Sequence, residues 1–127
     1  MQGLGKGDIS MTELEELKKK LRLFAADRDW DQYHTPKNLA MALIAEAAEV
    51  VEHFQWLTEE ESSNVHPETL EEISHELADV FVYLIRLADK LGIDLIEAAN
   101  RKIALNEEKY PADKARGSAK KYTAYHD

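Results

Sequence analysis

The chain has 127 residues, with 16 Lys or Arg against 25 Asp or Glu, so its formal charge at pH 7 is −9. This length suits one domain, and the negative charge argues against nucleic acid as the main partner. The chain contains no cysteine, which excludes disulfides, thiolate metal sites and cysteine nucleophiles. No apolar run approaches the roughly 20 residues of a membrane span, and the opening residues lack the apolar core of a secretory signal. We therefore expect a cytoplasmic protein.

The first predicted elements are a flexible leader and two helices. Residues 1–10 form the expected leader. From Thr12 to about Ala26, apolar residues recur at helical spacing, which predicts an amphipathic helix. Thr35 and Pro36 match a helix N-cap followed by proline at the first helical position. A second helix is therefore predicted from about Pro36 to Leu57.

Two further helices follow a charged connection. Proline at position 67 predicts the start of a third helix, which extends to residue 91 because Gly92 is the expected C-terminal stop. Asp94 and Glu97 have the spacing of a capping box, so a fourth helix begins there. Pro111 limits this fourth helix.

These patterns predict an all-α fold, because no segment has the alternation of a strand. We expect a four-to-five-helix bundle over residues 11–111, followed by a basic and irregular C-terminal tail, residues 112–127. Apolar residues extend around much of the circumference of the third helix. This apolar surface is larger than one packing face in a small domain can cover. Burial of this excess surface against another subunit predicts a homo-oligomer.

Glu46 stands out on the second helix. At about 100° per residue it falls in the apolar stripe between Leu39, Leu43 and Val50. A carboxylate in such a stripe is rarely left without a partner, so Glu46 is a candidate site residue. Glu49, three residues later, leaves the same side of the helix.

Glu76 and Asp79 repeat this spacing on the third helix, although spacing alone favours ordinary surface charge for this pair. If the four carboxylates meet, shared protons, basic side chains or a divalent cation must relieve their repulsion. Ligands that are all oxygen favour Mg²⁺, with Mn²⁺ as the alternative, over zinc. Glu72 and His75 form the E-x-x-H unit of di-iron bundles, but the chain has no second copy, which disfavours a monomeric di-iron site.

Three segments resemble the MazG-like all-α nucleoside triphosphate pyrophosphohydrolases, most closely the dCTP pyrophosphatase type: FAADRDWDQYHTPKNLAMALIAEAAEVVEHFQW, HELADVFVYLIRLADKLGIDL and NEEKYPADKARGSAKKYT. The order E-x-x-E, then E-x-x-D about thirty residues later, then K-Y-P carries the resemblance. It implies Mg²⁺-dependent cleavage of dCTP, or of modified and non-canonical deoxynucleotides, between the α and β phosphates. The products are the monophosphate and pyrophosphate, as expected of a house-cleaning enzyme. The resemblance also implies a tetramer arranged as a dimer of dimers.

The resemblance assigns roles to particular residues. The metal-binding carboxylates it implies are Glu46, Glu49, Glu76 and Asp79. We expect Glu49 also to accept the proton of the attacking water. The substrate-binding positions it implies are Trp30, Trp56, His34, Asn38 and Tyr83 around the base, and Lys102, Asn106 and Tyr110 near the phosphates. Taken singly, each of these side chains is equally well explained by packing or surface charge.

Two alternative functions stay open. The first is a related pyrophosphohydrolase with another base preference, such as dUTP or phosphoribosyl-ATP. The second is a non-catalytic helical protein with an interaction or regulatory role. The carboxylate quartet argues against this second alternative, because an interaction module has no reason to concentrate acid on facing helices. Neither nucleic acid nor a membrane is an expected partner.

Overall fold

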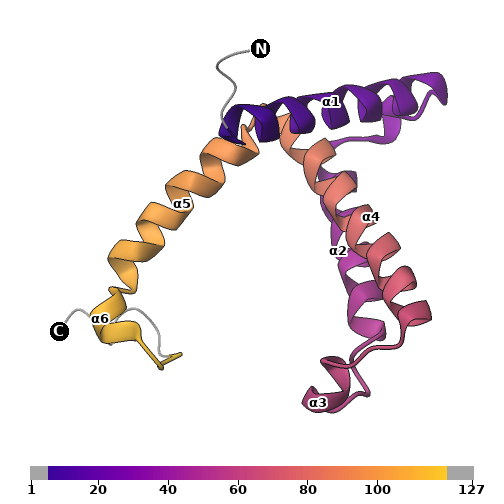
Figure 1. The fold of residues 1–127 in the computed structure, drawn as a ribbon. Helices are drawn as coiled ribbons and strands as arrows, with labels where there is room; N and C mark the ends of the chain where they lie inside the picture. Colours follow the sequence, from indigo (N-terminus) through magenta and orange to yellow (C-terminus); the bar gives the residue numbers. More distant parts are fainter. Residues whose placement is uncertain (1–5, 120–127) are drawn as a thin grey trace. The chain divides into compact units, whose positions relative to one another are not determined.

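The computed structural model describes residues 6–119, with side chains described from residue 13. These residues form six α-helices and one short 3-10 helix, and none of residues 6–119 lies in a strand (Figure 1). The all-α prediction is thereby confirmed. The chain divides into two units, one ending at Ile93 and the other beginning at Asp94. Within the described part, no helix combines the length and apolarity needed to cross a membrane.

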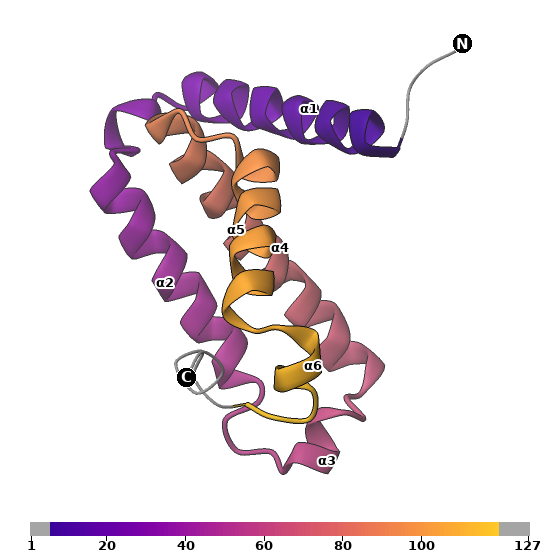
Figure 2. The ribbon, with the colours of Figure 1, turned by 90° about the vertical axis from the view of Figure 1, so that its left-hand side faces the viewer.

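The first unit is built on a helical hairpin. Its elements are α1 (Lys6–Asp27), η1 (Asp31–Tyr33), α2 (Pro36–Glu52), α3 (Glu59–Ser62) and α4 (Pro67–Leu91). Helices α2 and α4 pack side by side and run in opposite directions, and α1 packs against α4 near the end where α2 begins (Figures 1 and 2). The small apolar core takes residues from all three helices: Ala25, Leu39, Ile73, Ile85 and Ala88.

The capping residues explain where α2 begins and ends. The Thr35 hydroxyl accepts a hydrogen bond from the backbone N–H of Asn38 at 3.2 Å, and Pro36 occupies the first turn as predicted. The helix ends at Glu52, short of the predicted Leu57. The backbone N–H groups of His53 and Phe54 bond to carbonyls three residues back, which turns the chain out of the helix.

The bounds predicted for α4 are confirmed at residues 67 and 91. Gly92 follows with φ of 67°, the left-handed conformation that ends many helices. The start of α1 differs from the prediction, since this helix begins at Lys6 and takes in part of the expected leader. Helix α3 was also not predicted, and it forms because Thr58 and Glu61 make a reciprocal capping box.

The second unit contains α5 (Leu95–Lys109) and α6 (Ala112–Ala115). The Asp94 carboxylate caps α5 by accepting a hydrogen bond from the backbone N–H of Glu97 at 3.0 Å. The Glu97 side chain bonds to Arg101. Helix α6 gives regular structure to part of the tail predicted as irregular. Two basic residues of that tail lie outside the described residues: Lys120 and Lys121.

Candidate active site

Four carboxylates gather on the facing helices of the hairpin. Glu46 and Glu49 belong to α2, and Glu76 and Asp79 belong to α4. Glu46 and Glu76 are half-buried, whereas Glu49 and Asp79 are exposed. Burial raises the pKa of Glu46, and the neighbouring carboxyls of Glu49, Asp79 and Glu76 raise it further. The hairpin therefore brings the two acidic pairs into one electrostatic cluster.

This cluster suits a hard divalent cation by its chemistry. The Oε2 atom of Glu46 is buried and, within residues 13–119, has no hydrogen-bond partner. Carboxylate oxygens are the donors that Mg²⁺ and Mn²⁺ prefer. Within the same residues, no group of three or more His, Cys, Asp or Glu side chains is arranged to hold a metal ion.

His53 is a site residue that the sequence reasoning missed. Its Nε2 lies against Glu76 Oε2, which makes an ion pair when the imidazole is protonated. Among the described residues no hydrogen bond is assigned to the buried Glu76 Oε2, so His53 is its neighbouring polar group. His53 follows Glu46 by seven residues and Glu49 by four, which is one face of a helix. That spacing is the signal that points to it.

A cavity of about 300 Å³ opens beside Asp79. Its walls come from α1, from the segment between α1 and α2, and from α4: Leu21, Phe24, Trp30, His34, Asp79, Val82, Tyr83 and Arg86. The rings of Phe24 and Trp30 meet edge to face, with centroids 5.8 Å apart and planes at 67°. The cavity thus joins an aromatic wall to one of the four carboxylates.

This cavity contains three of the residues expected around a base: Trp30, His34 and Tyr83. Two others lie elsewhere in the first unit. Asn38 donates a hydrogen bond from its side-chain amide to the backbone carbonyl of Tyr33 at 3.0 Å, and so holds the preceding loop. Trp56 follows α2, is 87% exposed and does not line the cavity. A base-stacking role for Trp56 stays a prediction.

The residues expected near the phosphates belong to the second unit. Lys102, Asn106 and Tyr110 recur every four residues along one side of α5 and its C-cap. Lys102 and Asn106 are exposed. Their approach to a triphosphate stays a prediction.

Arg86 is the second site residue that the sequence reasoning missed. Its side chain is 4% exposed, although Arg is rarely buried unless it is paired. Nη2 donates to Asp31 Oδ1 at 2.9 Å, and Nη1 lies 3.6 Å from Asp89 Oδ2. In the sequence Arg86 lies between apolar residues of α4. The helical period alone does not show whether its guanidinium is buried or solvated.

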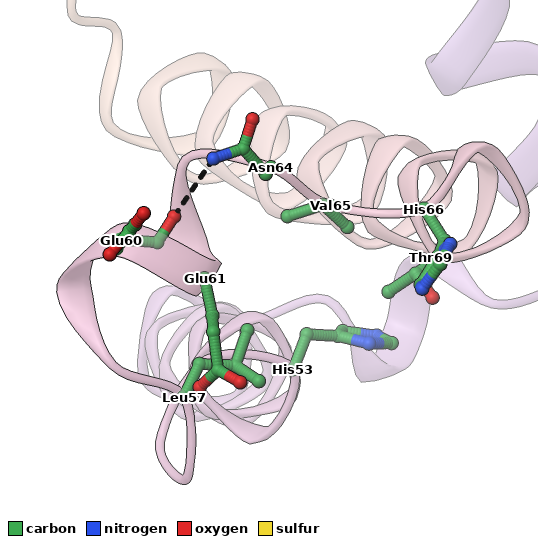
Figure 3. A pocket seen from close by; sticks show the side chains of 8 residues that line it. All are labelled: His53, Leu57, Glu60, Glu61, Asn64, Val65, His66 and Thr69. Atoms are coloured by element: carbon green, nitrogen blue, oxygen red, sulfur yellow. Dashed lines mark hydrogen bonds between the residues drawn. The ribbon is translucent and has the colours of Figure 1, made fainter.

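A second cavity, of about 500 Å³, lies where α2 ends and α4 begins (Figure 3). The side chains in Figure 3 are His53, Leu57, Glu60, Glu61, Asn64, Val65, His66 and Thr69. Several of its polar groups serve local structure, since Glu61 caps α3 and the Asn64 amide donates to the Glu60 carbonyl at 3.2 Å. Its wall has two Glu and no Lys or Arg, so it suits a triphosphate less well than the cavity beside Asp79.

The all-helical fold and the facing E-x-x-E and E-x-x-D pairs agree with a family comparison. The chain belongs to the MazG-like family, whose profile matches residues 42–124. The dCTP pyrophosphatase 1 of Homo sapiens is 41% identical over 112 residues, which cover 87% of this chain. The Mus musculus dCTP pyrophosphatase 1 is 40% identical over the same length. The chain spans 66% of the length of these curated relatives.

A solved structure supports the fold. A pyrophosphatase from Archaeoglobus fulgidus DSM 4304 is 40% identical to this chain and superimposes with a TM-score of 0.76. The match covers 87% of this chain and 98% of the archaeal one. The helices described above are thus shared across most of both chains.

Proposed function

We propose that this protein is a Mg²⁺-dependent nucleoside triphosphate pyrophosphohydrolase. It cleaves dCTP, or modified and non-canonical deoxynucleotides, between the α and β phosphates and releases pyrophosphate. The observation that carries the proposal is the buried Oε2 of Glu46, which has no hydrogen-bond partner among residues 13–119 and belongs to a carboxylate cluster that adjoins an aromatic cavity. The names of the relatives from Homo sapiens and Archaeoglobus fulgidus support a pyrophosphatase activity.

The carboxylates account for the metal requirement. Glu46, Glu49, Glu76 and Asp79 would hold Mg²⁺, which when bound offsets the charge of the triphosphate and makes water more acidic. Mn²⁺ has the same preference for oxygen and is the expected substitute. Because a triphosphate carries about four negative charges, a protein with a net charge of −9 needs such a cation to bind it.

The protein's own groups would orient the substrate and move the proton. Glu49 is exposed at the cluster, where its carboxylate would accept the proton of the water that attacks the α-phosphorus. The base would enter the cavity, where Trp30 and Phe24 offer aromatic surface. Lys102 on α5 would supply a fixed positive charge for the phosphates, alongside Asn106 and Tyr110.

We further propose that the protein acts as a homo-oligomer, with a dimer of dimers as the final assembly. Helix α4 leaves a stripe of large apolar side chains exposed: Leu70, Leu77, Phe81, Leu84 and Leu91. Helix α2 exposes Met41, Ile44 and Val51. Apolar stripes of this extent on two helices mark interaction surfaces, and a second copy of the chain carries the matching stripes under two-fold symmetry.

Pyrophosphate release from a panel of triphosphates tests the proposed activity. We expect turnover of dCTP in Mg²⁺, turnover in Mn²⁺, and none in EDTA. Glu49→Gln keeps the side-chain volume and removes the charge, so it should lower the rate roughly 10²- to 10⁴-fold. Full activity in EDTA would refute the metal requirement. Absence of turnover on every triphosphate would favour a non-catalytic regulatory protein.

A further inference from the structure

Arg86 and His34 make a polar corner in the wall of the cavity beside Asp79. The guanidinium contacts His34 Nδ1 through two nitrogens, with Nε donating at 3.4 Å and Nη2 at 3.2 Å. Within residues 13–119, Nε2 of the imidazole has no hydrogen-bond partner. The imidazole therefore has one nitrogen engaged by protein and one left for a ligand.

The chemistry of Arg86 decides which imidazole nitrogen carries the proton. A guanidinium has five N–H donors, no acceptor, and stays protonated in proteins. Nδ1 of His34 must face it with a lone pair, because a proton there would point at a positive donor. In a neutral imidazole the proton then resides on Nε2. Burial, followed by the charge of Arg86, lowers the pKa of His34, which favours the neutral ring.

The position of the guanidinium is itself fixed from two sides. Nη2 donates to Asp31 on η1, and Nη1 faces Asp89 one turn along α4 at 3.6 Å. Lys90 also donates to Asp31 Oδ1, at 2.7 Å, which keeps that carboxylate in place. A buried guanidinium held by two carboxylates loses little further freedom when it contacts His34.

We infer that Arg86 is a positioning residue that holds His34 as the Nε2–H tautomer, so that the cavity offers the base a hydrogen-bond donor and prefers cytosine to uracil. The two bases differ at N3, which accepts a hydrogen bond in cytosine and carries a proton in uracil. An Nε2–H group that faces N3 therefore pairs with cytosine and opposes uracil. The inference rests on the proposed function, because it requires a pyrimidine in this cavity. It assigns to Arg86 and His34 a base preference that the carboxylates do not determine.

Nitrogen-15 NMR of the histidine rings tests the tautomer without any need for turnover. Wild-type His34 at neutral pH should show a pyrrole-like Nε2 and a pyridine-like Nδ1. Arg86→Met should give a mixture of tautomers. The matched control is Arg22→Met, because Arg22 binds the same Asp89 carboxylate at 2.6 Å without contacting His34, and its spectrum should resemble the wild type. A proton on Nδ1 in the wild-type protein, or an imidazolium at neutral pH, would overturn the inference even if no variant folds.

Kinetics with dCTP and dUTP test the consequence for the base. We expect wild-type kcat/KM to favour dCTP and Arg86→Met to reduce that ratio about tenfold, the effect of one hydrogen bond, mainly through the KM for dCTP. His34→Gln retains a donor near the Nε2 position, so adding Arg86→Met to it should change the ratio little. An equal or higher wild-type kcat/KM for dUTP, or an unchanged ratio in Arg86→Met, would overturn the inference. Failure to hydrolyse either nucleotide would refute the proposed function instead, while the NMR result still decides the role of Arg86.

Discussion

Two features of Glu46 disfavour its negative charge when no cation is bound. Its Oε2 is enclosed without a hydrogen-bond partner in the described part of the chain, and three other carboxylates surround it. We expect Glu46→Gln to raise the free energy of unfolding in EDTA, because the substitution removes a desolvated and repelled charge. The same variant should lose pyrophosphohydrolase activity in Mg²⁺. Urea unfolding and pyrophosphate release measure the two effects, and lower stability in EDTA would contradict this account of the cluster.

The two tryptophans, both expected to stack on the base, differ in their surroundings and exposure in the structure. Trp30 lines the cavity and packs on Phe24, whereas Trp56 is 87% exposed. Trp30→Ala should weaken dCTP binding by about 1–3 kcal/mol, the loss of one stacked base. Inorganic triphosphate, which has no base, should bind the variant almost as well as the wild type.

Trp56→Ala serves as the comparison for Trp30. A similar loss of dCTP affinity in this variant would show that Trp56 also contributes to binding the base. Calorimetric titration of both ligands measures these affinities. Equal losses for dCTP and inorganic triphosphate in Trp30→Ala would indicate a structural role for that ring.

At the scale of elements, Asp89 and Arg22 join α4 to α1. The two side chains form a bidentate pair, with Arg22 Nε and Nη2 donating at 2.7 and 2.6 Å. The hydrogen bond from Arg22 lowers the pKa of Asp89 below its ordinary value. Such a group contributes stability that is fully present above the unfolded pKa of about 3.9 and is lost as pH falls through the lower folded value.

Asp89→Asn tests this contribution. The variant should be less stable than the wild type at pH 7, and the difference should shrink as the pH falls below about 4. Thermal unfolding followed by circular dichroism across this pH range measures the difference. A difference that is constant with pH would show that the charge of Asp89 contributes nothing and that only its shape matters.

The C-terminus of α4 depends on the backbone of Gly92. Its φ of 67° is left-handed, and a Cβ added there would meet no atom of the described residues within 4 Å. Gly92→Ala should therefore cost roughly 1–2 kcal/mol of conformational strain and no steric clash. Gly92→Asn should cost less, because Asn tolerates this conformation better. Equal stability of the Ala variant and the wild type in urea would refute a left-handed cap at this position.

The exposed apolar stripes on α2 and α4 predict that copies of the chain associate. Light scattering at micromolar concentration should give a mass above the 14.5 kDa of one chain, at least that of a dimer. Leu77→Glu places a charge in the middle of the α4 stripe, where it should shift the protein toward smaller species. Leu23→Glu is the control, because Leu23 on α1 is 63% exposed but lies outside that stripe. A monodisperse wild-type monomer would contradict the proposed assembly.

The helix ends that depend on local chemistry could be predicted from the amino-acid sequence. The Thr35 cap, the left-handed Gly92 and the Asp94 cap act between residues at most a few positions apart, so their signals were readable. The same holds for Glu46, whose place in an apolar stripe follows from helical period alone. The predicted end of α2 was wrong for a local reason. After Glu52, backbone N–H groups bond to carbonyls three residues back instead of continuing the helical pattern of four.

Which of these residues meet depends on how the helices pack. Packing of α2 against α4 joined the Glu46 and Glu76 pairs and placed His53 on Glu76, across thirty and twenty-three positions of sequence. It also buried Arg86 against His34, although a guanidinium beside apolar residues on a helix is usually solvated. Burial and contact of this kind depend on distances between helices that no local spacing encodes, because each is set by the side chains that fill the space between them.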